Sequence, residues 1–153
     1  MELLPLTQKQ KFENEPKLEK KLKSLNQLLD ELKAKPLTEK VINEINQWVA
    51  QINNTNEIKP LRKIARKNYH KIITLLVKKE KLTPPGYYRN IWMAIGMTAF
   101  GVPLGTTFGV AMENMAFLGI GIPIGLAIGL AIGTEMDNNA AKNGTQLNTD
   151  YEI

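Results

Sequence analysis

The residues of this chain that could do chemistry are few, and they do not form a recognisable catalytic pattern. His70 is the single histidine and there is no cysteine, so neither a Cys- or His-rich metal site nor a thiol nucleophile is expected. No spacing of Ser, Thr and Lys pairs a nucleophile with a base, and no phosphate-binding glycine loop is present. We therefore predict a protein that is not an enzyme, with no catalytic residue, no metal and no cofactor.

Two titratable residues stand apart from the rest. His70 lies among lysines and arginines, which predicts a surface residue rather than a ligand. Glu113 is the only charged residue between positions 91 and 134, and we interpret it as part of a polar turn that faces water. A pore-mouth or proton-linked role for Glu113 would be the alternative, but no neighbouring residue could complete a relay.

Basic side chains gather between positions 59 and 89, where ten Lys and Arg stand against Glu80 alone. Such a run is either a solvated helix face beside a membrane or a surface for anionic headgroups, to which each basic residue contributes on the order of 1 kcal/mol. Nucleic acid is the less expected partner, because no nucleic-acid-binding motif accompanies the charge. The residues predicted to contact an anionic surface are Lys59, Arg62, Lys63, Arg66, Lys67, Lys71, Lys78, Lys79 and Lys81.

The charge distribution divides the chain into two unlike halves. Residues 1–90 hold 19 Lys and Arg against 10 Asp and Glu, whereas residues 91–153 hold one Lys and five acids. A single fold with one shared core would not normally segregate charge in this way. A soluble protein with residues 91–134 as its core is the less favoured alternative, because a few short amphipathic helices could hardly cover so long an apolar stretch.

The first half predicts a small helical domain. Residues 1–14 have no periodic pattern and are expected to form a loose arm, without the basic and apolar regions of a signal peptide. Three amphipathic patterns follow within residues 15–82, and Thr38 is placed to cap the second of them. They predict a cytosolic three-helix domain. Its expected core positions are Leu18, Leu22, Leu25, Leu29, Leu32, Val41, Ile45, Trp48, Val49, Ile52, Leu61, Ile64, Ala65, Tyr69, Ile72, Leu75 and Leu76.

The second half predicts a transmembrane helical hairpin over residues 91–134. Residues 83–90 contain Pro84-Pro85-Gly86 and form the expected hinge, and residues 135–153 form a polar C-terminal tail. The two spans, 91–112 and 115–134, contain 22 and 20 uncharged residues, so each helix would extend about 30 Å, the thickness of a bilayer core. Because the polar break between them is so short, the spans must be antiparallel.

The flanking residues predict how the hairpin is oriented. Lysines precede the first span and only Glu113 lies at the tip, so the positive-inside rule places both termini in the cytoplasm, with a bacterial inner membrane as the expected location. Aromatic and basic residues at the entrance of the first span fit the headgroup region. The predicted membrane-interface residues are Tyr87, Tyr88, Arg89 and Trp92.

The two spans contain a repeated glycine pattern. Gly101-Val-Pro-Leu-Gly105 recurs twenty residues later as Gly121-Ile-Pro-Ile-Gly125, and a glycine at every fourth position predicts one side-chain-free groove on each helix. Pro103 and Pro123 are expected to kink both helices at matching depth. The predicted helix-packing residues are Gly101, Gly105, Gly109, Gly121, Gly125, Gly129 and Gly133.

This duplicated array resembles small bacterial glycine-zipper membrane proteins over residues 96–134. The resemblance implies a membrane hairpin that packs within and between subunits and assigns no particular activity. The lipoprotein members of that type carry a lipidated cysteine, which this chain lacks. A rotor-ring subunit of an ATP synthase, another glycine-rich hairpin, needs a carboxylate within a span, whereas Glu113 lies at the tip.

The sequence therefore predicts an all-α protein that joins a cytosolic helical domain to a membrane hairpin. Its expected partners are the lipid bilayer, a second copy of itself, and another membrane or cytosolic protein. We expect a non-catalytic anchor that presents the basic helical domain and self-associates through the glycine stripes. An oligomeric pore is one alternative, and a membrane tether for nucleic acid or another acidic partner is a second.

Overall fold

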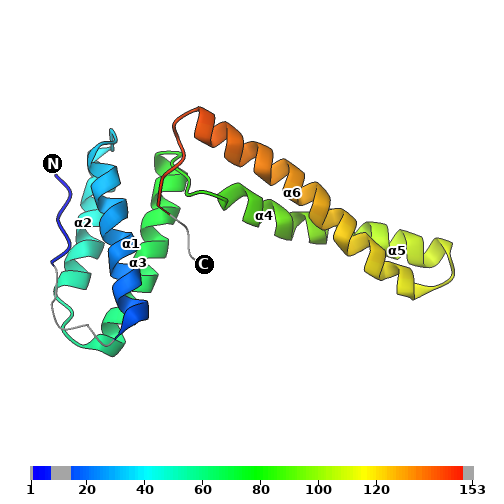
Figure 1. Cartoon of the computed structure of the whole chain (residues 1–153), viewed down its shortest axis with the longest axis horizontal. Coiled ribbons are helices and arrows are strands. Elements are labelled where there is room, and N and C mark those ends of the chain that lie inside the picture. Colours follow the sequence, from blue (N-terminus) through cyan, green and yellow to red (C-terminus); the bar gives the residue numbers. More distant parts are fainter. Residues whose placement is uncertain (1, 8–14, 150–153) are drawn as a thin grey trace. The chain divides into compact units, whose positions relative to one another are not determined.

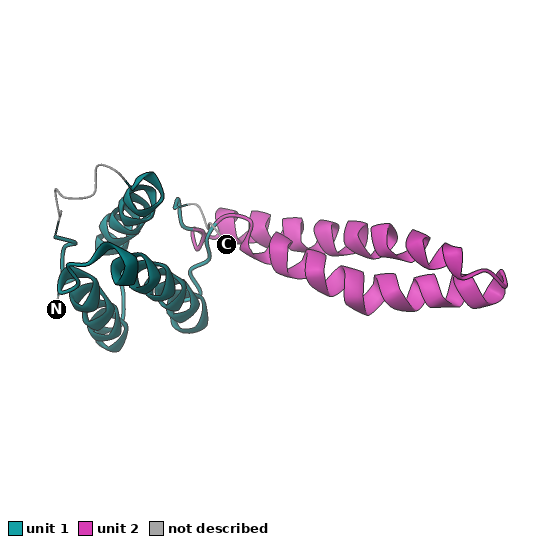
Figure 2. Cartoon of the chain, turned by 90° about the horizontal axis from the view of Figure 1, so that it is seen from below, with its two compact units in different colours: residues 1–84, 147–150 teal, residues 85–146, 151–153 magenta. Residues whose placement is uncertain are grey.

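The computed structural model describes residues 2–7 and 15–149, and every regular element in these ranges is helical (Figure 1). The chain divides into two compact units (Figure 2). The first unit contains the chain up to Pro84 together with the segment that begins at Leu147, and the second extends from Pro85 to Gln146. The all-helical fold class is confirmed for the described residues.

The first unit contains three helices, α1 (Pro16–Lys33), α2 (Glu39–Asn53) and α3 (Ile58–Lys79). Both α1 and α2 pack against α3, which is therefore the central helix. Pro16 lies in the first turn of α1, where its missing N–H is not needed. Thr38 holds the N-cap position of α2, but its hydroxyl donates to Glu80 Oε1 over 2.7 Å instead of capping the helix.

Most residues of the predicted apolar stripes form the core of this unit, although Trp48 and Ile64 are only half-buried. Leu28 is fully buried although it lies outside the predicted seam, whereas Leu22 is only half-buried. Asn68 and Ile73 on α3 are buried as well. The Asn68 amide is satisfied because it donates to the Trp48 carbonyl at 3.1 Å and to Gln51 Oε1 at 3.2 Å. One polar cross-link thus joins α2 to α3 inside the core.

The N-terminal arm is ordered over residues 2–7, which differs from the loose arm expected for residues 1–14. It lies along α2 (Figure 1), where Asn46 and Asn53 hydrogen-bond its backbone. Leu3 is buried. Helical periodicity could not have found this contact, because an extended segment held through its backbone leaves no such pattern. The rest of the predicted arm, residues 1 and 8–14, lies outside the described residues.

The C-terminal segment returns to the first unit, although residues 135–153 were expected to form one polar tail. Leu147 is buried and its N–H donates to the Thr83 carbonyl over 2.8 Å. The Glu31 carboxylate of α1 accepts bonds from the Asn148 backbone N–H at 2.9 and 3.0 Å and from the Thr149 hydroxyl at 3.2 Å. A single buried leucine and one charged acceptor hold this segment.

The second unit is an antiparallel helical hairpin (Figure 2). Its first half consists of α4 (Tyr87–Gly96), a π-helical turn η1 (Met97–Gly101) and α5 (Val102–Ala111). Its second half consists of a 3₁₀ turn η2 (Met115–Phe117) and α6 (Leu118–Lys142). Helix α6 continues eight residues past the predicted end of the second span, and α4 begins within the predicted hinge.

Two helical stretches of this unit, Tyr87–Ala111 and Met115–Lys142, are long and apolar enough to cross a membrane. Most of their residues are exposed in the chain itself, whereas the core helix of a soluble protein is mostly buried. The helical hairpin predicted for residues 91–134 is therefore present.

Candidate functional site: the glycine-faced hairpin

All seven predicted helix-packing glycines are buried where the two halves of the hairpin meet. A Cβ on Gly129 would collide with the Trp92 carbonyl, and a Cβ on Gly125 would collide with the backbone of Gly101. Gly121 faces the backbones of Gly101 and Gly105 in the same way. The two glycine stripes thus pack against each other within one chain, and while the hairpin is closed a second chain has no access to them.

Gly96 belongs to the same contact although the sequence pattern did not include it. It is buried, and a Cβ there would collide with the carbonyl of Gly125 and the backbone of Gly129. Gly96 precedes Gly101 by five residues rather than four, and the intervening segment is the π-helical turn η1. Because a π turn holds one residue more than an α turn, it returns Gly96 to the stripe.

The two prolines, predicted to kink both helices at matching depth, lie in different backbone environments. Pro103 lies two residues after the end of η1, and in a regular helix its ring would clash with the carbonyl four residues before it. The wider turn relieves that crowding, and the Val102 N–H bonds the Met97 carbonyl five residues back. Pro123 lies inside the uninterrupted helix α6. The sequence repeat is therefore not repeated in the backbone.

Asp137 is a site residue that sequence reasoning missed. Its carboxylate is buried and accepts the backbone N–H groups of Tyr88 and Arg89, each at 3.0 Å. These are unpaired N–H groups of the first turn of α4, so Asp137 caps that helix from the opposite half of the hairpin. Asp137 follows Gly133 by four residues and so continues the glycine stripe of α6. That spacing was the signal that could have revealed it.

The outward surface of the hairpin is apolar. Its large exposed side chains come from both halves and extend to the tip: Ile91, Ile95, Phe100, Val102, Phe108, Val110, Met112, Met115, Ile120, Ile122, Ile124 and Leu130. The threonine hydroxyls of the first half do not break this surface, because each bonds a carbonyl of its own helix. Thr98 bonds those of Ala94 and Ile95, while Thr106 and Thr107 both bond that of Pro103.

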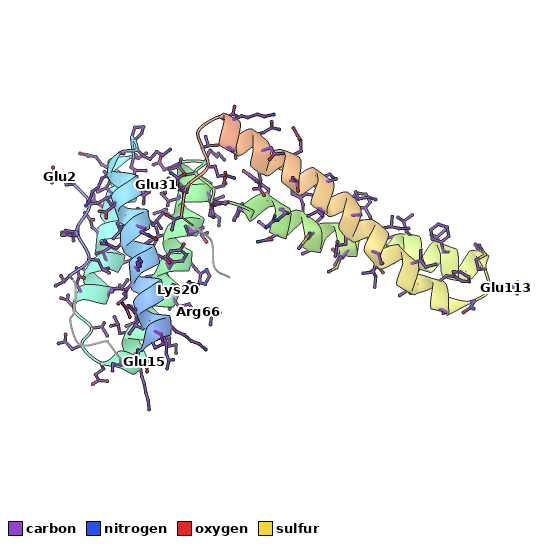
Figure 3. All side chains as sticks on the ribbon, viewed as in Figure 1. Glu2, Glu15, Lys20, Glu31, Arg66 and Glu113 are labelled. Atoms are coloured by element: carbon purple, nitrogen blue, oxygen red, sulfur yellow. The ribbon has the colours of Figure 1, made fainter. Side chains whose placement is uncertain are left out.

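The tip of the hairpin is a short polar turn. Glu113 is exposed at the far end of the unit and has a left-handed backbone, with φ of +51° (Figure 3). The Asn114 side chain accepts the Ala116 N–H at 2.9 Å, and the Asn114 N–H donates to the Gly109 carbonyl at 2.9 Å. The Glu113 N–H also bonds within the turn, to the Val110 carbonyl at 3.2 Å, whereas its side chain is exposed to solvent as the sequence predicted.

The predicted membrane-interface residues form the first two turns of α4. Tyr87 and Tyr88 contact each other edge to face, with ring centroids 5.4 Å apart. Tyr87, Tyr88 and Trp92 are half-buried, and Arg89 is exposed. Their backbone packs against Gly129 and Gly133. The open end of the hairpin thus carries amphipathic aromatic side chains outside its glycine contact.

The predicted basic residues share one exposed face of the first unit. Seven lie on the exposed side of α3, Lys79 lies at the C-terminal end of that helix and Lys81 follows it; all nine are exposed. Arg62 lies 3.7 Å from the Glu15 carboxylate, a solvent-exposed pair of little energetic weight. Lys71 lies over the Trp48 ring at 5.5 Å. The face, on which Figure 3 labels Arg66, is therefore strongly positive.

His70 lies on this basic face and is half-buried rather than fully exposed. Burial, with the nearby charges of Lys21 and Arg66, lowers the pKa of His70 below its usual value of 6.5, so the imidazole is neutral at pH 7. No group of three or more His, Cys, Asp or Glu side chains that could hold a metal lies within residues 2–7 and 15–149.

Comparison of the chain with protein-family models, with curated proteins and with solved structures finds no match.

Proposed function

We propose that this protein is a non-catalytic membrane anchor whose hairpin inserts in a bilayer and holds the basic helical domain at its surface. One observation carries the proposal: the glycine sides of the hairpin face each other, and its aliphatic and aromatic side chains face outward. Lipid is the partner that suits such a surface, because a soluble chain rarely exposes so continuous an apolar area. Lipid tails offer packing partners to the outward side chains, and close backbone contact holds the helices together.

The location proposed from the sequence is a bacterial inner membrane with both chain ends in the cytoplasm. The basic residues near the entrance of the hairpin support this orientation. A pore is less well supported, since Thr98, Thr106 and Thr107 satisfy their hydroxyls within their own helix and leave no polar face to line water. Self-association stays a prediction, and its hairpin contact would involve the outward aliphatic surface, because the glycine stripes are already paired.

Charge placed on the outward surface tests insertion. The double variant Val102→Lys and Ile124→Lys changes two exposed side chains near mid-span, and each lysine is expected to cost about 3 kcal/mol in a bilayer. We expect most of this variant to be released by alkaline carbonate from vesicles in which it was synthesised, while the parent chain stays with the pellet. Ile58→Lys, at an exposed apolar position of the first unit, is the matched control and should behave as the parent does.

A carbonate extraction in which the lysine variant behaves as the parent does would exclude the proposed membrane anchor. In a soluble protein, lysine at these exposed positions would leave the chain unchanged or improve its solubility. Release of the parent chain by carbonate, or retention of the double variant to the same extent as the parent, would therefore contradict insertion.

The basic face is proposed to contact anionic headgroups. In vesicles containing phosphatidylglycerol, we expect acylation of Lys63 and Lys67 in the full chain to slow about fivefold relative to pure phosphatidylcholine, which corresponds to roughly 1 kcal/mol per basic residue. Lys40, exposed at the start of α2, serves as the internal control. Equal rates in both vesicles would contradict the lipid contact, and protection by added RNA or DNA instead would favour the nucleic-acid alternative.

A further inference from the structure

Helix α2 holds the N-terminal arm by a repeated backbone contact. The Asn46 side chain accepts the Leu4 N–H at 2.8 Å and donates to the Glu2 carbonyl at 3.0 Å. Seven residues later, the Asn53 side chain accepts the Thr7 N–H at 2.9 Å and donates to the Pro5 carbonyl at 3.1 Å. Each amide therefore makes a two-bond pair with one carbonyl and with the N–H two residues after it.

The two pairs repeat because the spacings of the helix and the arm agree. Asn46 and Asn53 lie two helical turns apart on one face of α2, a rise of roughly 10.5 Å. Their backbone partners are shifted by three residues along the arm, and three extended residues cover about 9–10 Å. The two side-chain amides of α2 are therefore spaced like backbone groups three residues apart in an extended peptide.

The side chains of the arm follow the same period of three. Leu3 is 9% exposed and Leu6 is half-buried, with Pro5 between them. A period of three residues is that of the polyproline II conformation, which brings every third side chain to one side. The contact thus selects an extended backbone with apolar residues three positions apart, and none of its four hydrogen bonds depends on the type of side chain in the arm.

We propose that this face of α2 is a docking site for an extended, proline-containing segment of a partner protein with two apolar residues three positions apart, and that the N-terminal arm covers it in competition. Main-chain hydrogen bonds with pockets for selected side chains are a general mode of peptide recognition. The four bonds lie at exposed positions, where each contributes little net stability, so a partner segment can displace the arm. The site gives the helical domain of the proposed anchor a partner and rests on that proposal, although its residues are not among the membrane and basic residues tested above.

Peptide binding in detergent tests the site without a membrane. The probe is a fluorescent peptide with the sequence of residues 2–7, titrated by anisotropy into the full chain and into a variant that lacks residues 2–7. We expect the variant without the arm to bind at least about tenfold more tightly, because the competing segment is absent. A probe with serine in place of Leu3 and Leu6 should bind neither protein.

Asparagine variants decide whether the amides form the site. In the chain without the arm, Asn46→Ala with Asn53→Ala should weaken binding at least about tenfold, while Asn43→Ala, an exposed position on the same helix, should have no effect. Circular dichroism of each variant establishes that it is folded. Equal affinity with and without the arm, no binding by the folded armless chain, or binding unchanged by the double substitution would overturn the proposal. None of these outcomes alters the carbonate or acylation results, so the two proposals fail separately.

Discussion

Replacing Gly129 with leucine is expected to force the two halves of the hairpin apart. A Cβ at this position would collide with the carbonyl of Trp92, a backbone atom that cannot rotate away. The helices would have to separate over several turns, since the neighbouring contacts are also backbone against backbone. We expect a loss of about 3 kcal/mol or more in the free energy of unfolding, at the upper end of the cost of overpacking. Titration of the detergent-solubilised chain with a denaturing detergent measures this loss.

Gly119→Leu is the matched control. Gly119 also lies on α6, but a Cβ there meets nothing within 4 Å, so the same substitution adds a side chain to open space. The chain has two tryptophans; in a Trp48→Phe background the fluorescence of Trp92 reports on the contact beside Gly129. If Gly129→Leu and Gly119→Leu unfold at the same denaturant concentration, the glycine contact does not hold the hairpin together.

The hairpin could be predicted because its residues repeat at a regular interval. A glycine at every fourth position of two adjacent apolar stretches indicates two faces that can approach closely, and all seven of those residues lie in the contact. Gly96 was not predicted as a packing residue, because it lies five residues before Gly101 and so breaks the four-residue interval. The π turn that restores Gly96 to the stripe depends on the particular backbone before Pro103, and spacing alone does not specify it.

The two chain ends were the hardest parts to predict. The arm is held by side-chain amides that bond its backbone, and the C-terminal segment by one buried leucine and the carboxylate of Glu31. Neither contact repeats at a helical or strand interval, and both join residues at least forty positions apart. The sequence therefore predicts a loose arm where no periodic pattern is present, and a polar tail where the composition is polar.

The core of the helical domain was easier to predict than the chain ends and harder to predict than the hairpin. The apolar stripes identified most of its core, but the choice between Leu22 and Leu28 on α1 depends on which side of that helix meets α3. The predicted heptad pattern assumes that α1 contacts its partner along one narrow line of residues. Because α1 packs against one side of a central helix, its buried face is rotated away from that line.

Asp137 links the glycine stripe to the end of the opposite helix. Along α6, every fourth residue from Gly121 to Gly133 is a glycine that admits the opposing backbone. At the next position of the stripe that opposing helix begins, and it presents unpaired N–H groups instead of a closed surface. An acceptor is then needed where the glycines end, and a carboxylate with two oxygens serves two N–H groups at once.

Asp137→Ala is therefore expected to destabilise the open end of the hairpin by about 2 kcal/mol, since it removes a cap and leaves the part-buried N–H groups of Tyr88 and Arg89 without a partner. Amide hydrogen exchange by NMR should show faster exchange at these two residues, with little change at the tip near Asn114. Asp137→Asn keeps one acceptor oxygen and should lie between the two. Glu135→Ala removes an exposed carboxylate from the same helix and is the control. Unchanged protection of both amides in Asp137→Ala would show that the carboxylate does not cap α4.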